Sequence, residues 1–141
     1  MRVSSKADYG VRALFDLAQR IGQGPVQSRD IAFRQGIPEA YLHQVLGALG
    51  RAGFVRSTRG PSGGHELTRP PDQVTLLDVL VVLDGPDRRA HPHLDATAKS
   101  DVIHETWHEL QEQSEAFLSS ITLETLLERK RADDPTGSYS I

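Results

Sequence analysis

The sequence contains no cysteine among its 141 residues. That absence excludes disulfide bonds, metal sites with thiolate ligands and enzymes that depend on a thiol nucleophile. The rest of the composition, with 38% hydrophobic and 25% charged residues, is ordinary for a globular protein. A chain of this length suits one compact domain or a small domain with an oligomerisation arm.

A long apolar segment is missing as well. No stretch reaches the roughly 18 consecutive apolar residues that a membrane-spanning helix needs. The first residues, Met1 to Ser4, lead directly into an amphipathic segment and lack the apolar centre of a signal peptide. We therefore expect a cytoplasmic protein that has no membrane partner.

The net charge of −3 is unevenly distributed along the chain. Residues 1–71 carry ten lysines and arginines against five aspartates and glutamates, a net charge of +5. Residues 72–141 carry six basic and fourteen acidic residues, a net charge of −8. This asymmetry indicates a basic nucleic-acid reader joined to an acidic module that does not contact the nucleic acid. The alternative is that one half simply carries more solvated charge.

The first half of the chain predicts two helices in close succession. Ser5 and Asp8 have the spacing of a capping box and open a helix that ends at Gly22. Ser28 is the predicted N-cap of a short second helix, which Gly36 closes.

A third helix is predicted over about residues 38–52, ending at Gly53. Its internal glycines, Gly47 and Gly50, cost roughly 1 kcal/mol each relative to alanine, and we expect them to allow close packing against a neighbouring helix. The apolar residues of its buried stripe are Leu42, Val45, Leu46 and Leu49.

A hairpin follows the third helix. Residues 54–57 and 65–68 read as short strands, and the segment Arg59–Gly64 between them is rich in turn residues. A helix-turn-helix followed by a hairpin with a basic, glycine-rich tip is typical of a winged helix, in which a helix enters the major groove of DNA and the loop reaches the backbone or minor groove. Residues 1–84 are therefore predicted to form a winged-helix DNA-binding domain.

The second half is predicted to be helical. Thr75 caps a nearly continuous aliphatic helix, residues 76–83, which should be buried. A loop over residues 85–98 precedes two dimerisation helices in residues 99–131, the second of them capped by Thr122. Residues 132–141 read as a flexible tail.

One face of the long helix repeats apolar residues at alternating spacings of four and three. That pattern is an a/d seam over about two and a half heptads, and a partner must cover it. We therefore predict a homodimer. Its interface consists of Ile103, Trp107, Leu110, Ser114, Phe117 and Ile121.

Several segments together resemble a known family. They are residues 5–14, residues 37–42 and, most specifically, the wing sequence over residues 59–67, supported by Trp107 and residues 121–123. These segments are similar to the bacterial winged-helix repressors that include the iron–sulfur cluster regulator IscR, the nitric-oxide sensor NsrR and the cysteine-metabolism repressor CymR. The resemblance covers about residues 1–131. It implies a mostly α fold with a two-stranded wing, a long dimerisation helix and a swapped last helix that packs on the partner subunit.

Many members of that family hold an iron–sulfur cluster with three cysteines placed between the fourth and fifth helices. This chain has no cysteine there, and oxygen and nitrogen atoms are poor substitutes for thiolates. We therefore expect no iron–sulfur cluster. The region keeps histidines and aspartates, which indicate either a divalent-metal site or a solvated loop with surface histidines, and His104 and His108 share one helical face. The candidate ligands are His91, His93, Asp101, His104 and, from the opposite subunit, Asp8.

The predicted DNA reader combines the third helix with the wing. Arg59 is expected in the minor groove, the wing glycines are expected to let the backbone approach phosphates, and Gln44 is suited to pairing with adenine. Ser28 is either an N-cap or a phosphate ligand at a helix N-terminus, or both, and Tyr41 either faces the DNA or is half-buried. The full predicted interface is Ser28, Arg29, Glu39, Tyr41, His43, Gln44, Arg59, Gly60, Ser62, Gly63 and Gly64.

Together these observations predict a homodimeric transcriptional regulator, a repressor, that binds a pseudo-palindromic operator in double-stranded DNA. Two alternatives remain open. One is a winged-helix module that binds a protein, and the other is a metal- or pH-responsive regulator that uses the histidines and aspartates of the loop. A metal-dependent hydrolase is disfavoured because no nucleophile, base and orienting group accompany the histidines, so we expect no enzyme.

Overall fold

The computed structural model describes residues 3–85 and 101–134. The predicted loop at 85–98 lies outside these residues except for Gly85, and so do residues 135–141 of the predicted tail. The prediction that this tail begins at residue 132 is wrong, because the last helix continues to Asp133. Within the described part, the expected fold class is confirmed, with six α-helices, one short 3-10 helix and a two-stranded sheet. The elements are α1 (Ser5–Gln19), α2 (Ser28–Gln35), α3 (Glu39–Arg51), β1 (Val55–Thr58), β2 (Gly64–Leu67), η1 (Pro71–Gln73), α4 (Leu76–Asp84), α5 (Val102–Ser120) and α6 (Leu123–Asp133).

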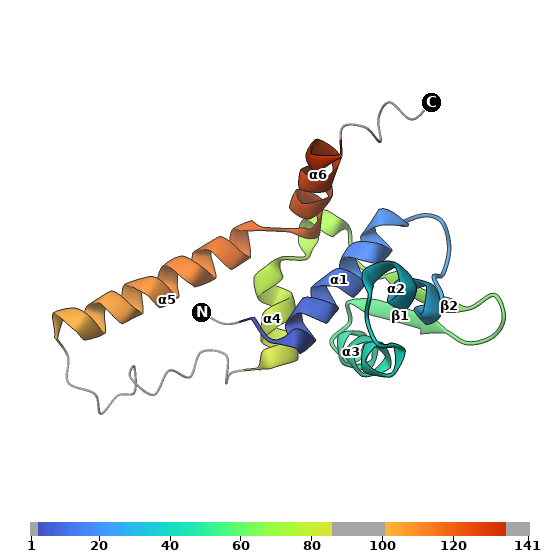
Figure 1. Cartoon of the computed structure of the whole chain (residues 1–141), viewed down its shortest axis with the longest axis horizontal. Helices are drawn as coiled ribbons and strands as arrows, with labels where there is room; N and C mark the ends of the chain where they lie inside the picture. Colours follow the sequence, from blue (N-terminus) through green and yellow to red (C-terminus); the bar gives the residue numbers. More distant parts are fainter. Residues whose placement is uncertain (1–2, 86–100, 135–141) are drawn as a thin grey trace.

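Helix α1 lies at the centre of the molecule (Figure 1). Helices α2 and α3 and the sheet lie on one side of it, and α4 and α6 lie on the other, while α5 extends away from the body. Strands β1 and β2 are antiparallel, with Val55 opposite Leu67 and Thr58 opposite Gly64. The hairpin loop between them points away from α5, at the opposite end of the molecule (Figure 1).

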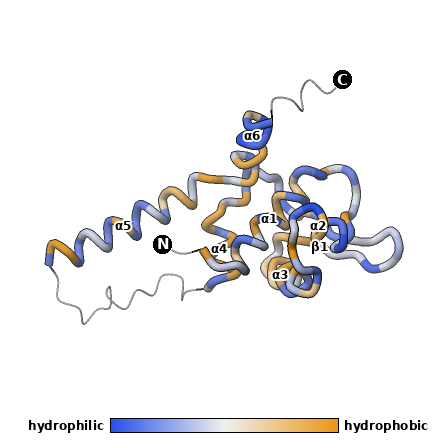
Figure 2. The backbone as a smooth tube through the Cα atoms, in the orientation of Figure 1, coloured by the Kyte–Doolittle hydropathy of each residue, from blue (hydrophilic) through white to orange (hydrophobic). Residues whose placement is uncertain are grey.

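The core forms where α1 meets its neighbours. The predicted stripe of α3 is buried as expected, and α4 contributes Val79 and Leu83 to the same core. Figure 2 colours much of α3 and α4 as hydrophobic, while α6 and α2 are largely hydrophilic. Helix α6 also packs on α1, with Leu123 fully buried. The resemblance implied that this last helix packs on a partner; here it lies against α1 of its own chain.

Close packing between helices occurs at Gly10, and the prediction that Gly47 and Gly50 provide it is wrong. A Cβ atom on Gly10 would overlap Cδ1 of Leu83, so a larger residue would force this buried side chain or α4 itself to shift. Gly47 has only the side chain of Arg51 nearby, at 3.3 Å. The sequence drew attention to two glycines that weaken α3, but the tertiary packing depends on a different one.

The helix starts differ from the predictions by one residue. Ser4, and not Ser5, caps α1, and its hydroxyl accepts a hydrogen bond from the Ala7 N–H at 3.0 Å. The same hydroxyl donates to Asp84 at the end of α4, at 2.5 Å. This contact with a distant helix favours Ser4 over its neighbour as the cap, and Asp8 instead pairs with Arg12.

The cap of α2 is Gln27, so Ser28 is the first helical residue and not the predicted N-cap. The predictions for the last two short helices are confirmed, because Thr75 caps α4 and Thr122 caps α6, each within a capping box. These two helix starts are joined by a backbone bridge between Thr75 and Thr122. The start of α6 is therefore fixed to the start of α4.

A buried carboxylate joins α1 to α2. Asp16 is fully buried in the last turn of α1, and Arg34 of α2 donates to both of its oxygens, at 2.9 and 3.0 Å. Arg20 and Gln35 also donate to Asp16, each at 3.3 Å. The hydrogen bond from Arg34 to Asp16 raises the pKa of the guanidinium above its ordinary value. The ion pair thus fixes the first helix of the helix-turn-helix against the central helix.

Replacing Asp16 by alanine is expected to lower the free energy of unfolding by about 3 kcal/mol, because breaking a buried ion pair leaves its partners without a counter-charge. The value lies at the low end of the range because Arg20 and Arg34 remain partly exposed to water. Urea unfolding followed by circular dichroism measures the change.

The matched control is Asp8→Ala, which removes an equally short ion pair with Arg12 at an exposed position of the same helix. We expect a change within about 0.5 kcal/mol there. Equal effects of the two substitutions would contradict the role given to Asp16.

Candidate nucleic-acid interface

The outward face of α3 carries most of the predicted base-reading side chains. Glu39, His43 and Gln44 are exposed, and the His43 ring lies 3.8 Å from the Glu39 carboxylate. Tyr41 differs, because its ring packs edge-on against Tyr9 with 5.2 Å between the ring centroids and is partly buried. Of the two predictions for Tyr41, the half-buried one describes the structure.

The tip of the wing, residues 59–62, is exposed, whereas the wing is buried at Gly63. Arg59, Gly60 and Ser62 are exposed, and a Cβ atom on Gly60 would meet only open space. Gly63 is buried, and a Cβ atom there would overlap the Thr58 carbonyl. The structure therefore gives Gly63 an internal packing role, which differs from the predicted role of approaching a phosphate.

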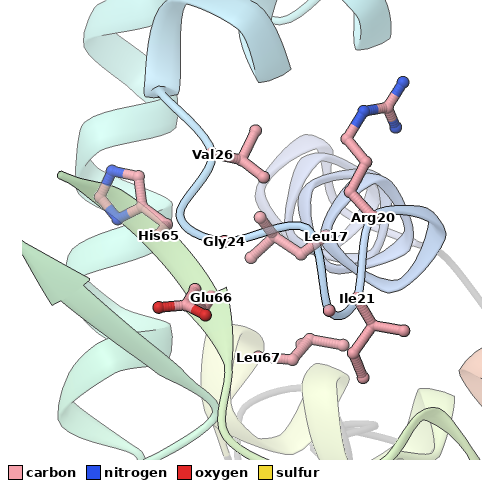
Figure 3. Close-up of a pocket in the computed structure, with 9 residues that line it drawn as sticks. Leu17, Arg20, Ile21, Gly24, Val26, His65, Glu66 and Leu67 are labelled. Atoms are coloured by element: carbon pink, nitrogen blue, oxygen red, sulfur yellow. The ribbon is translucent and has the colours of Figure 1, made fainter. Parts of the chain in front are cut away.

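Gly64 has a comparable role at the base of the wing. Its φ angle is +147°, and a Cβ atom would overlap the backbone of Val26. Val26 and His65 exchange two backbone hydrogen bonds, at 2.8 and 3.0 Å, so the segment before α2 lies alongside β2 like a third strand. Figure 3 shows the small pocket where this segment and β2 meet α1, with Leu17 and Leu67 among its lining residues.

Gln27 links the start of α2 to the wing, and the sequence analysis did not identify it. Its amide nitrogen donates to the carbonyl oxygens of Pro61 and Gly63, at 3.3 and 3.2 Å. Because both acceptors are backbone atoms in a distant turn, no side-chain pattern in the sequence could have pointed to this contact. It places Ser28 and Arg29, in the first turn of α2, beside the wing.

The positive charges of this surface are available for a ligand. In the part of the chain that the structure describes, Arg29 and Arg59 are exposed and have no ion-pair partner. By contrast, Arg34 is neutralised by Asp16 and Arg56 lies 3.5 Å from Glu66. An anion such as a DNA phosphate would therefore meet two uncompensated guanidinium groups, one on α2 and one on the wing.

The structure does not bring the predicted metal ligands together. Asp8 pairs with Arg12, and Asp101 is the N-cap of α5, where it accepts from the N–H groups of the next turn. His91 and His93 lie outside the described residues. Over residues 3–85 and 101–134, no group of three or more histidine and acidic side chains is placed to hold a metal ion.

Most of the predicted dimer seam lies on the surface of this single chain. Ile103, Trp107, Leu110 and Phe117 are about half exposed, at 46–58% of their full surface. Ser114 is partly buried among them. Ile121 does not belong to this exposed stripe. It follows the end of α5 and is buried within its own chain, with 6% of its surface exposed.

A helix-turn-helix with its second helix exposed, followed by a basic two-stranded wing, defines a winged-helix DNA-binding protein. The comparisons with known proteins then place it more closely. The model of the Rrf2 family, described as iron-dependent transcriptional regulators, matches residues 3–129. The chain belongs to this family of DNA-binding transcriptional regulators, which is not a family of enzymes.

Relatives and solved structures agree with this assignment. The chain is 34% identical to the regulator IscR of Photobacterium profundum over 140 residues, which is 97% of this chain and 81% of that protein. It is similar to the structure of CymR, the global cysteine regulator of Bacillus subtilis, with a TM-score of 0.83 and 32% identity over 92% of this chain and 98% of that one. The structure of IscR from T. potens gives a TM-score of 0.75 and 39% identity, covering 92% of this chain and 88% of that one.

The described helices carry no membrane-spanning candidate, since none of them is both long enough and apolar enough to cross a bilayer.

His65 connects the stability of the wing base to pH. Its Nδ1 atom lies 2.7 Å from the Ser57 hydroxyl on the opposite strand. Burial lowers the pKa of His65, and the nearby His43 lowers it further. The folded protein therefore favours the neutral imidazole.

Because this pKa is lowered, the unfolded chain binds a proton at a higher pH than the folded chain does. We expect the free energy of unfolding to fall as the pH drops from about 6.5 toward the lower pKa of folded His65. Urea titrations between about pH 7.5 and 5.5 measure this slope, and His65→Gln should reduce it.

His43→Gln is the control, because it removes only the smaller cause of the shift and leaves His65 buried. Its pH slope should stay close to that of the wild type. A His65→Gln variant with an unchanged slope would show that the pH dependence arises elsewhere.

Proposed function

We propose that this protein is a homodimeric transcriptional repressor that binds a pseudo-palindromic operator, with one winged helix in each half-site. In this proposal α3 enters the major groove and the wing tip enters the adjacent minor groove. The protein acts in the cytoplasm, where bacterial DNA is accessible. Its interface is formed by the exposed members of the predicted set, and Gly63 and Gly64 serve by holding the tip in place.

The single observation that carries the DNA-binding role is a pair of exposed arginines without an ion-pair partner in the described residues, Arg29 on α2 and Arg59 on the wing. The hydrogen bonds of Gln27 hold these two elements together. Negative potential is concentrated in narrow minor grooves, which favours an arginine at the wing tip. Fixing the wing relative to α2 keeps the two charges at a constant separation, as a repeating phosphate backbone requires.

The exposed stripe of α5 supports the homodimer. An apolar face of Ile103, Trp107, Leu110 and Phe117 along one helix is costly to leave in water. The heptad-like spacing suits a second copy of the same helix. A two-fold dimer would then present two identical readers to the two halves of an operator.

The proposal excludes the iron–sulfur cluster that many members of the family hold according to the resemblance described above. Such clusters are held by cysteine thiolates, and this chain has none. The residues that could replace them do not converge either, because Asp8 and Asp101 already have partners within the protein. The donor set therefore does not fit a cluster, and the signal that this regulator reads must be of another kind.

Replacing Arg59 by alanine tests the wing. We expect operator affinity to fall by about 1–3 kcal/mol and the slope of log affinity against log salt to decrease by about one. Fluorescence anisotropy with a duplex selected by the wild-type protein measures both quantities. In a reporter strain the same variant should raise transcription from the bound promoter, whereas an activator would lose transcription.

Arg131→Ala is the matched control, because Arg131 lies on α6 and pairs with Glu124. It should leave both the affinity and the salt slope unchanged. If neither the wild type nor the control shows salt-dependent binding to any selected duplex, the winged helix is a protein-interaction module and the proposal is wrong.

The dimer is tested by placing a charge in the seam. Leu110→Glu should convert the protein to a monomer at micromolar concentrations, because the carboxylate would be desolvated in the interface. Light scattering after size-exclusion chromatography gives the mass. Ala116→Glu adds the same charge at an exposed position on the opposite side of α5 and should leave the dimer intact. A wild type that is already monomeric would contradict the proposal.

A further inference from the structure

A pair of histidines on α5 lies outside the DNA reader and beside the apolar stripe. His104 and His108 are one turn apart, and their Nε2 atoms are 3.0 Å from each other. Their ring centroids are 4.5 Å apart, with an angle of 77° between the ring planes. The two rings thus bring the same nitrogen of each imidazole within hydrogen-bond distance, with one ring donating and the other accepting.

We propose that His104 and His108 form a binding site for a divalent transition-metal ion of the Cu²⁺ or Ni²⁺ class. A metal ion about 2.0–2.1 Å from each nitrogen would see the two ligands at an angle of roughly 95°. That angle is closer to the 90° or so between neighbouring ligands of a tetragonal site than to the larger angle of a tetrahedral one, so it favours Cu²⁺ and Ni²⁺ over Zn²⁺.

The charge of α5 favours a cation at this place. The helix Val102–Ser120 contains four glutamates and neither lysine nor arginine. Its negative potential raises the local concentration of cations. Because no third histidine or acidic side chain joins the pair in the part of the chain that the structure describes, water fills the remaining coordination positions.

The site is independent of DNA binding. Both imidazoles must present their Nε2 lone pairs to the metal ion, which displaces the proton between them. The inference uses only residues of α5 and goes beyond the proposed function. It can fail while the protein still binds its operator, and the reverse is also true.

The single tryptophan of the chain reports on this site directly. Trp107 lies next to His108 in the sequence and is 46% exposed. A bound paramagnetic Cu²⁺ ion should quench its fluorescence, and a chelator should restore it. Titration of the full-length protein with CuCl₂, NiCl₂ and ZnCl₂ should give the tightest binding for Cu²⁺, while MgCl₂ should have no effect.

His104→Gln and His108→Gln should each weaken Cu²⁺ binding by at least about tenfold, because losing even an outer partner of a metal ligand costs that much. Glutamine is a good helix former, and circular dichroism should show unchanged helicity. Electron paramagnetic resonance of the copper-loaded wild type should show coupling to two nitrogen ligands, which each variant should lose.

Two control variants keep the test specific. His43→Gln, on α3, and the double variant His91→Gln/His93→Gln should bind Cu²⁺ like the wild type. The proposal is overturned if either single variant at 104 or 108 keeps the wild-type affinity, or if the double variant abolishes binding. In those cases the pair is only an imidazole–imidazole hydrogen bond.

Discussion

The arrangement of the reader depends on one buried carboxylate. Asp16 is fully buried and accepts hydrogen bonds from Arg20, Arg34 and Gln35, and the two arginines compensate its charge. An unpaired carboxylate at this depth would be very costly, so α2 can take only the orientation that brings Arg34 to it. Since Gln27 at the start of α2 donates hydrogen bonds to the wing, the orientation set by Asp16 extends to the wing loop.

Local signals in the sequence predicted the elements of the fold well. Helical spacing, the threonine caps at Thr75 and Thr122 and the glycine-rich wing are all encoded within a few residues, and the structure contains each of them. Signals that depend on distant partners were missed or misplaced. The sequence did not show that Ser4, whose hydroxyl contacts the distant Asp84, is the cap of α1. It also did not show that the close contact between helices is at Gly10.

The exposure of the candidate interface residues was predictable from the sequence only in part. Arg59 could be placed at the wing tip from the sequence, because a turn exposes its central residues. Whether a glycine faces solvent or its own backbone depends on the three-dimensional path of the turn, and so the packing role of Gly63 was not visible. Gln27 was missed for the same reason. Ile121 fitted the heptad spacing of the seam, yet α5 ends just before it and the side chain enters the core.

Helix α5 is attached to the described body mainly at one end. Leu118 is its buried residue, packed against Ala7 and Leu80, while the opposite end projects outward (Figure 1). A helix of 19 residues is about 28 Å long. Its far end lies about 24 Å from the Leu118 contact, so a tilt of about 5° at that contact displaces the far end by roughly 2.1 Å. Small adjustments between α4 and α5 are thus magnified along the helix.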